Sequence, residues 1–319
     1  MDKRKNYVLN IHDVVTAIEF SPFGWVSSLL AVGTSTNVII ISCKFPEDDA
    51  LVEDLEYKYI REFHHGCFVN CIAWSPQTTL TQIPHVLRFA TVGGDKKIRF
   101  FHSDVKNEDT IQILEGHTDY INYISFEPQN GEEFASVSDD HTCRIWSVNG
   151  TLKFTFLLTS PGVFVSWHPD ELPGKLMVAE KKGIIRFYNI NKQQPMMSLD
   201  CNLTPLMSAD WCTTNSLQVG CVAATDLLLW NISLSSQPVN KKLAHNKGAL
   251  CFSFSRINLN VMATRGRPGN EIKVMNAKLN QIILSENLPA GQGISWHCKL
   301  PILAAGGDRK VHIWKIDST

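Results

Sequence analysis

The chain has 319 residues, of which 44% are hydrophobic and 19% charged, and it contains 8 Trp and 16 Phe residues. This composition is typical of a globular protein with an aromatic core, and it excludes a disordered or fibrous chain. The 30 basic and 31 acidic residues leave a formal net charge of -1, and no basic run is longer than the cluster Lys3–Lys5, so no direct nucleic-acid partner is expected.

The N-terminal region carries no signal for secretion or membrane insertion. Residues 1–15 begin with basic side chains but have Asn, His and Asp where a signal peptide needs an unbroken apolar stretch. Residues 20–43 are uncharged, yet Pro22, Gly24 and the polar segment 33–37 interrupt them, which favours two short strands joined by a turn over a spanning helix. The nine cysteines form no CxxC pair, a pattern typical of reduced thiols in the cytosol or nucleus.

One sequence unit recurs along the whole chain. It consists of a short strand that ends in an aromatic residue, a β-rich segment, a tight turn and a strand that closes on a second aromatic residue. The first-strand aromatics of the seven units are Phe20, Trp74, Phe126, Trp167, Trp211, Phe254 and Trp296. From the third unit onward they are 41 to 44 residues apart, the period of a four-stranded propeller blade. Insertions at Lys44–Tyr59 and Gln77–Val86 account for the two longer spacings.

The third unit, LEGHTDYINYISFEP followed by FASVSDDHTCRIWSV, resembles the WD-repeat consensus. The resemblance implies a buried hydrogen-bond tetrad of His117, Ser136, Asp140 and Trp146, in which Asp bonds His, His bonds Ser, and Ser meets the indole N–H. Such a network is stable only when every member is paired. We therefore expect these four residues to have a structural role.

The other units retain parts of this pattern. Alignment on the first-strand aromatic puts the second unit's members at His65, Thr91, Asp95 and Phe101. The fifth and seventh units keep only the Asp and the Trp, at Asp226 with Trp230 and at Asp308 with Trp314. The fourth closes on Tyr188 and the sixth on Met275, and neither has an Asp in its turn.

These observations predict an all-β fold, a single seven-bladed WD-repeat β-propeller that spans residues 1–319. A repeat cannot bury its faces alone, and closure into a ring leaves only short, protected sheet edges. WD-repeat propellers close the ring by pairing the two ends of the chain. Residues Asn6–Ile11 should therefore form the outer strand of the blade that Val311–Ile316 completes.

Residues that could carry chemistry favour a structural interpretation. The group His64, His65, Cys67 and Cys71 lacks the spacing of a zinc site. The Ser, His and Asp of the tetrad offer no exposed nucleophile, and neither G-x-S-x-G nor H-E-x-x-H occurs. We expect no enzyme activity, no metal and no cofactor.

The insertion Lys44–Tyr59 is the most suggestive surface segment. It is acidic but also contains Leu51, Leu55 and Tyr57, so it is either a solvated loop or a segment that docks a partner, because long loops on rigid scaffolds often carry function. On the second interpretation Leu51, Leu55 and Tyr57 are the candidate contact residues.

Several blocks of sequence resemble one WD-repeat family in particular. They are FHHG (63–66), IAWSP (72–76), LEGHTD (114–119), ASVSDDHTCRIW (135–146), SPG with WHP (160–169), LMVAEK (176–181) and PLMSADWC (205–212). Together they are similar to the 37-kilodalton nucleoporin family of the Y-shaped outer-ring complex of the nuclear pore. The resemblance implies a scaffold that binds a large scaffold nucleoporin at the nuclear envelope and acts at the kinetochore in mitosis. From the residues alone, only an intracellular protein-binding propeller follows.

An alternative function is that of a WD-repeat substrate receptor of a ubiquitin ligase. Such propellers often carry Trp-Asp-x-Arg after a blade, whereas here Trp146 is followed by Ser-Val-Asn and Trp230 by Asn-Ile-Ser. A propeller enzyme is a third possibility. It should show converging acids or a set of metal ligands on a face of the ring.

Overall fold

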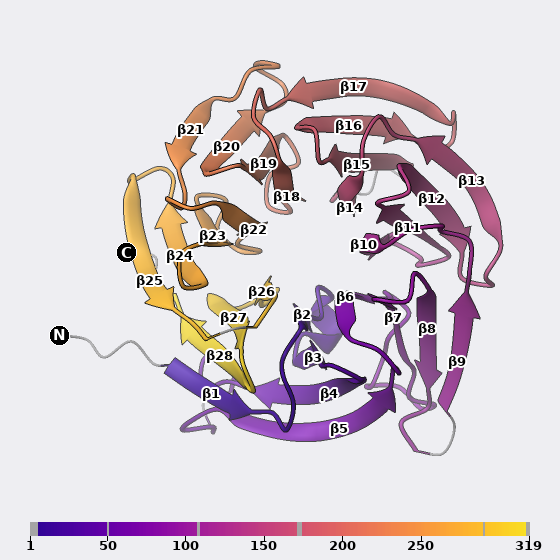
Figure 1. The fold of residues 1–319 in the computed structure, drawn as a ribbon. Helices are drawn as coiled ribbons and strands as arrows, with labels where there is room; N and C mark the ends of the chain where they lie inside the picture. Colours follow the sequence, from indigo (N-terminus) through magenta and orange to yellow (C-terminus); the bar gives the residue numbers. More distant parts are fainter. Residues whose placement is uncertain (1–5, 50, 107–108, 171–173, 290, 317–319) are drawn as a thin grey trace.

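The computed structural model describes residues 6–49, 51–106, 109–170, 174–289 and 291–316, so the basic cluster Lys3–Lys5 lies outside the described residues. The described strands form seven four-stranded antiparallel sheets, arranged radially around a central axis (Figure 1). The predicted all-β, seven-bladed propeller is therefore confirmed. Among the described residues, no helical segment has the length and apolar character needed to cross a membrane.

Each blade runs in chain order from its innermost to its outermost strand, except the seventh, whose outermost strand is β1. Blade 1 comprises β2 (Ala17–Phe20), β3 (Leu29–Gly33), β4 (Asn37–Lys44) and β5 (Glu56–His64). Blade 2 comprises β6 (Val69–Trp74), β7 (Leu87–Gly93), β8 (Ile98–Ser103) and β9 (Asp109–Leu114). Blade 3 comprises β10 (Ile121–Phe126), β11 (Glu133–Ser138), β12 (Thr142–Ser147) and β13 (Leu152–Leu157).

The later blades repeat this plan. Blade 4 comprises β14 (Gly162–Trp167), β15 (Lys175–Glu180), β16 (Ile184–Asn189) and β17 (Gln194–Asp200). Blade 5 comprises β18 (Leu206–Trp211), β19 (Gln218–Ala223), β20 (Asp226–Asn231) and β21 (Asn240–Leu243). Blade 6 comprises β22 (Ala249–Phe254), β23 (Val261–Gly266), β24 (Glu271–Asn276) and β25 (Gln281–Asn287). Blade 7 comprises β26 (Ile294–Trp296), β27 (Ile302–Gly307), β28 (Lys310–Lys315) and β1 (Asn6–Asn10).

The predicted first-strand aromatics all occupy the last residue of the innermost strand of a blade, and all are buried. Three of the tryptophans also link adjacent blades through the indole N–H. Trp74 donates to the carbonyl of Glu19 at 3.0 Å, Trp167 to that of Ser125 at 2.9 Å, and Trp296 to that of Ser253 at 3.2 Å. Each acceptor directly precedes the first-strand aromatic of the preceding blade. A buried indole needs such a partner, so these residues both fill the core and connect neighbouring blades.

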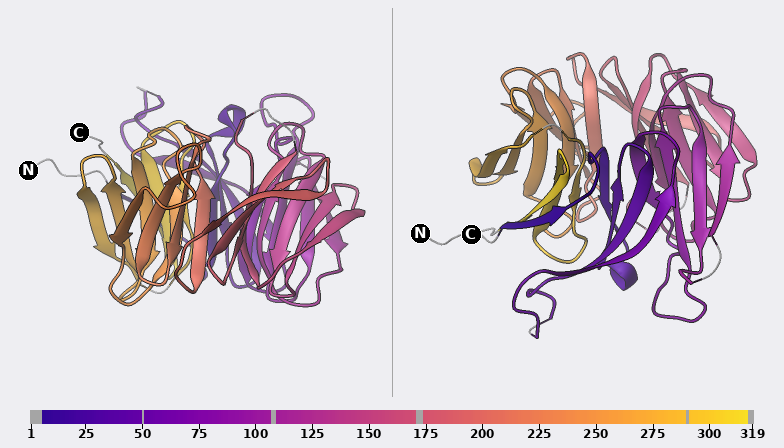
Figure 2. Two further views of the ribbon diagram at one scale, coloured as in Figure 1. Left: turned by 90° about the horizontal axis from the view of Figure 1, so that it is seen from above. Right: turned by 60° about the horizontal axis from the view of Figure 1, so that its bottom comes forward.

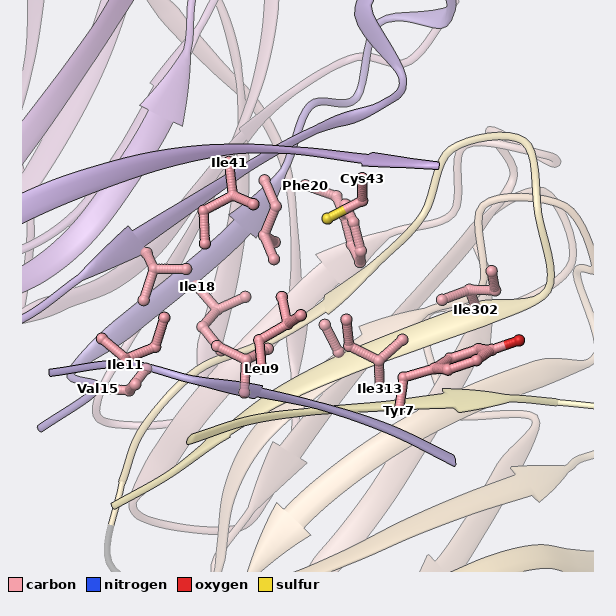
Figure 3. Close-up of a cluster of buried hydrophobic side chains, with 14 of the residues drawn as sticks. Tyr7, Leu9, Ile11, Val15, Ile18, Phe20, Ile41, Cys43, Ile302 and Ile313 are labelled. Atoms are coloured by element: carbon pink, nitrogen blue, oxygen red, sulfur yellow. The ribbon is translucent and has the colours of Figure 1, made fainter. Parts of the chain in front are cut away.

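The two ends of the chain close the ring as predicted. Strand β1 pairs antiparallel with β28, with Tyr7 opposite Ile313 and Leu9 opposite Val311. Side chains of β1 pack with residues of blades 1 and 7 in one buried apolar cluster, which includes Tyr7, Leu9, Ile18 and Ile313 (Figure 3). Because apolar burial stabilises by about 25 cal/mol per Å², the closure rests on side-chain packing as well as on backbone pairing.

The ring has two faces, which we name by the innermost strands: the start face, where these strands begin, and the end face, where they finish. Both sequence insertions lie on the end face. The loop of residues 45–55 joins β4 to β5, the loop of residues 75–86 joins β6 to β7, and both protrude beyond the strands (Figure 2). The insertion Lys44–Tyr59 is not loop throughout, because Lys44 pairs with Glu56 and Ile41 with Tyr59. The insertion therefore lengthens two strands as well as adding a loop.

Candidate functional site

The tetrad residues of the third unit lie together on the start face. The Nδ1 of His117 is 2.8 Å from Asp140 Oδ2, its Nε2 is 2.7 Å from Ser136 Oγ, and the indole N–H of Trp146 donates to that same oxygen at 2.8 Å. A carboxylate can only accept and an indole N–H can only donate. The chain of bonds therefore has one direction: Trp146 donates to Ser136, Ser136 to His117, and His117 to Asp140.

Asp140 also organises the turn between β11 and β12. Its carboxylate accepts the backbone N–H of Thr118 at 3.1 Å and of Thr142 at 3.0 Å, and the Thr142 hydroxyl at 2.6 Å. Burial alone would raise the pKa of Asp140, but the hydrogen bonds from Thr142 and His117 outweigh it, so the pKa is lowered. Burial lowers the pKa of His117 and is only partly opposed by Asp140. The neutral imidazole next to an ionised carboxylate is thus the favoured state near neutral pH.

The second unit places the aligned residues in the same register but does not join them. Asp95 pairs with Arg99 at 2.6 Å rather than with His65, and His65 Nδ1 contacts the Cys67 carbonyl at 2.9 Å. Neither His65 Nε2 nor Thr91 Oγ1 has a hydrogen-bond partner among the described residues. Burial lowers the pKa of His65 to about 4. An Arg therefore takes the carboxylate that would otherwise orient the histidine.

The sixth unit retains part of the network although its turn has no Asp. His245 Nε2 is 3.0 Å from Thr264 Oγ1, and His245 Nδ1 is 3.2 Å from Glu271 Oε2. Glu271 thus contacts the histidine in place of the turn Asp. A signal for this was present, since His245 stands nine residues before Phe254, as His117 does before Phe126.

The histidines and cysteines of residues 64–71 contact neighbouring groups or are buried in the core. His64 Nδ1 lies 3.2 Å from the Asn37 side chain, and Cys71 is buried on β6. Within the described ranges, no three His, Cys, Asp or Glu side chains gather in a way that could hold a metal ion.

The candidate contact residues of the insertion differ in what they offer a partner. The Leu51 side chain is 91% exposed, and Tyr57 on β5 is 46% exposed. Leu55 instead packs against the buried cluster that closes the ring, which includes Phe45, and the neighbouring Val52 is also buried. Much of the insertion's apolar content therefore anchors the loop to blades 1 and 7, and Leu51 and Tyr57 remain exposed.

Two exposed apolar residues on other end-face loops of blades 1 and 2 were not singled out from the sequence. Trp25 lies on the 3-10 turn η1 (Gly24–Val26) and is 52% exposed, and Ile83 in the loop 75–86 is 85% exposed. The Trp25 ring stacks on Phe23 with centroids 5.1 Å apart, and its indole N–H donates to the Thr78 carbonyl at 2.9 Å. Their signal was a Trp outside the repeat register and an Ile in a polar loop. We call Trp25, Leu51, Tyr57 and Ile83 the end-face patch.

The centre of the ring contains charged side chains from three blades. Arg256 pairs with Asp210 at 3.4 Å, and both line the two central cavities with Glu19. Each cavity has a volume of about 490 Å³, one opening toward each face. Burial raises the pKa of Glu19 to about 8, against the opposing charge of Arg256 and with a further rise from Asp210. Glu19 is therefore mostly protonated at neutral pH.

The sequence is similar to several known proteins. The family described as WD domain, G-beta repeat matches residues 57–102 and 108–147. The chain is 46% identical over 313 residues to nucleoporin Nup37 of Homo sapiens, covering 97% of this chain and 96% of that protein. It is 30% identical over 317 residues to nucleoporin Nup37 of Drosophila melanogaster, with 98% and 97% covered. It is also 33% identical, over a shorter stretch of 129 residues, to protein transport protein sec13 of Emericella nidulans, with 34% of this chain and 40% of that protein covered. The chain thus belongs to the Nup37 family of nucleoporins, and its propeller is built from WD repeats.

Proposed function

We propose that the chain is a non-catalytic scaffold component of the nuclear pore, in the Y-shaped outer-ring complex at the nuclear envelope. There it binds the large scaffold nucleoporin and lies among other outer-ring nucleoporins. In this role it supports pore assembly and the transport of mRNA and protein, and it acts at the kinetochore during cell division. The observation that carries the proposal is the 46% identity to human nucleoporin Nup37 over 97% of the chain.

The end-face patch is the surface we propose for the large scaffold nucleoporin. Trp25, Leu51 and Ile83 lie on loops at the end face of blades 1 and 2, and exposed loops on a rigid scaffold often carry binding residues. Trp25 is held by Phe23 and by the Thr78 carbonyl before any partner arrives, so little side-chain entropy is lost on binding. Aromatic anchors of this kind carry much of the energy of protein interfaces.

The acids of the insertion give this patch a polar rim. Asp48 and Asp54 are exposed and Asp49 is half-buried, whereas Glu47 pairs with Lys315 at 3.1 Å. An apolar centre with charged residues at its edge is the usual anatomy of a protein interface. The rim predicts that the partner presents basic residues around its apolar contact.

Titration of the purified large scaffold nucleoporin against variants of the full chain tests this proposal. Changing Leu51 and Ile83 together to Ser should weaken binding by roughly 10- to 100-fold. The matched control changes Leu217 and Ile257 to Ser, two exposed apolar residues on end-face loops of blades 5 and 6, and should leave affinity unchanged. Both variants should melt like the unmodified chain, because none of the four side chains is buried.

The outcomes separate the surface from the function. Equal losses in the test and control variants, or none in either, would place the interface elsewhere on the propeller. Failure of the unmodified chain to bind any outer-ring nucleoporin would refute the scaffold role itself.

A further inference from the structure

Arg265 on β23 is a buried cation without an acidic partner. Arg265 is 3% exposed and lines the cavity that opens to the start face. The guanidinium donates to the carbonyls of Gly291 and Gly306, and among the described residues no carboxylate lies within 4.0 Å of it. Burial lowers the pKa of Arg265. Carbonyl dipoles satisfy the donors but do not neutralise the charge, and buried charges are normally paired.

The other charges that line this cavity do not compensate Arg265. Asp210 already pairs with Arg256, and it also accepts the Phe254 backbone N–H at 2.9 Å. Glu19, with its raised pKa, carries little negative charge at neutral pH. Arg267 adds a second cation at the mouth. The cavity is therefore positively charged although the whole chain is close to neutral.

The rim of the start face extends this positive charge over blades 4 to 7. The loops that join the strands on this side are residues 181–183, 201–205, 224–225, 244–248, 267–270, 288–293 and 308–309. Their basic residues are Lys181, Lys182, Lys247, Arg267 and Arg309, against the acid Asp308. The loop of residues 11–16, which leads from β1 to β2 on the same side, adds Asp13, whose carboxylate accepts the Ser35 backbone N–H. Asp226 and Glu271, which begin strands on this face, already pair with Lys241 and Lys273. All five cations are exposed, and none forms an ion pair within the described part of the chain.

We propose that the start-face cavity binds an acidic peptide segment of a partner protein, with one carboxylate side chain entering the cavity toward Arg265. Arg267 lines the same cavity as Arg265. The loop of Lys247 is hydrogen-bonded to that of Arg267, with Arg267 N–H donating to the Gly248 carbonyl at 2.8 Å and Lys247 N–H to the Arg267 carbonyl at 3.2 Å. We therefore take Lys247 and Arg267 as the rim contacts of the peptide. This site lies on the face opposite the end-face patch, and it does not depend on the function proposed above.

The shape of the site favours a peptide over a nucleic acid. Nucleic-acid binding draws on many phosphate contacts along an extended basic surface. Here the buried cation stands inside a cavity of about 490 Å³, which admits a side chain but not a duplex. A guanidinium fork matches a carboxylate in geometry, and the pair gains strength when it is shielded from water.

Fluorescence anisotropy with a labelled hexaglutamate peptide tests the proposal on the purified full chain, with a hexaglutamine peptide as the control probe. The unmodified chain should bind hexaglutamate in a salt-dependent manner and should not bind hexaglutamine. Changing Lys247 and Arg267 together to Ala should weaken binding by about tenfold. The matched control changes Lys96 and Lys97 to Ala. These two lysines lie on the same face but already pair with Asp119 and Glu115, so affinity should stay the same.

A thermal measurement tests Arg265 directly. Hexaglutamate should raise the melting temperature of the unmodified chain and should fail to raise that of the Arg265→Gln variant, which loses the charge. If this variant does not fold, the Lys247 and Arg267 variant still decides the proposal. Equal binding of the two peptides, or an equal loss in the Lys96 and Lys97 control, would overturn it. So would a single-stranded oligonucleotide that binds more tightly than hexaglutamate and loses affinity in the same rim variant.

Discussion

Replacing Asp140 by Ala tests whether the tetrad holds the third blade together. The substitution removes the acceptor for His117, Thr142 and the Thr118 backbone N–H. Thr118 is exposed and can turn to water, and the Thr142 hydroxyl already lies 3.3 Å from His117 Nδ1 and can accept from it. The buried N–H of Thr142 is left without a partner. One unsatisfied buried donor plus the lost charge-assisted bonds should cost about 2 to 4 kcal/mol.

Urea unfolding followed by tryptophan fluorescence measures this loss directly. The control is Asp119→Ala, which removes the same charge from a nearby loop. It breaks only exposed contacts, an ion pair with Lys96 and a hydrogen bond from the Tyr120 backbone N–H, and should cost less than about 1 kcal/mol. Partner binding by the folded fraction of the Asp140→Ala variant should be unchanged. An unaltered unfolding midpoint together with lost binding would show that Asp140 is a contact residue and that the tetrad argument is wrong.

Three further predictions address the ring, its centre and its rim. Deleting residues 1–11 should expose the edge of β28 and the apolar cluster beneath β1, so light scattering should detect aggregation; a monomer with an unchanged melting temperature would contradict this. Glu19→Gln should stabilise the chain by up to about 5 kcal/mol at pH 9 and little at pH 4.5. An acid whose pKa is raised on folding contributes stability below its unfolded pKa, and that stability is lost as the pH rises through about 8. Equal effects at both pH values in urea titrations would refute it. Changing Asp48, Asp49 and Asp54 to Asn should slow association with the large scaffold nucleoporin and reduce its salt dependence, with dissociation unchanged in stopped-flow or surface-binding kinetics; a faster dissociation alone would argue against a steering role.

The repeat register made most of the fold predictable from the sequence. A first-strand aromatic at a fixed period marks the inner strand of a blade, and a buried indole there can reach the preceding blade, as Trp74 does to Glu19. The strand-like residues before the first unit likewise predicted closure on β28. These features are local and periodic, which is why sequence alone exposes them.

The sixth blade shows where the register argument was too strict. The WD-repeat pattern has Asp in a short turn and an aromatic residue at the close of the unit, whereas this blade has Glu271 and Met275. A longer acidic side chain after a longer turn still reaches His245. The position of the histidine relative to the first-strand aromatic indicates the network more reliably than the identity of the acid does.

The surfaces could not be predicted in the same way, because exposure depends on contacts between distant segments. Leu51 and Leu55 are similar in sequence context, yet one is exposed and the other packs on the ring-closing cluster. The charge of the start-face cavity depends on Asp210 and Arg256 from adjacent blades and on Glu19 across the ring. No local sequence pattern indicates that Asp210 and Arg256 pair with each other and leave Arg265 without an acidic partner.

Affinity capture of the tagged full chain from growing cells, quantified by mass spectrometry, tests the central claim most directly. A scaffold of the outer ring should recover nucleoporins in fixed proportion, the large scaffold nucleoporin first among them, and the Leu51 and Ile83 variant should lose them while the Leu217 and Ile257 control retains them. Recovery of ubiquitin-ligase subunits in place of nucleoporins would contradict the account and favour a substrate receptor.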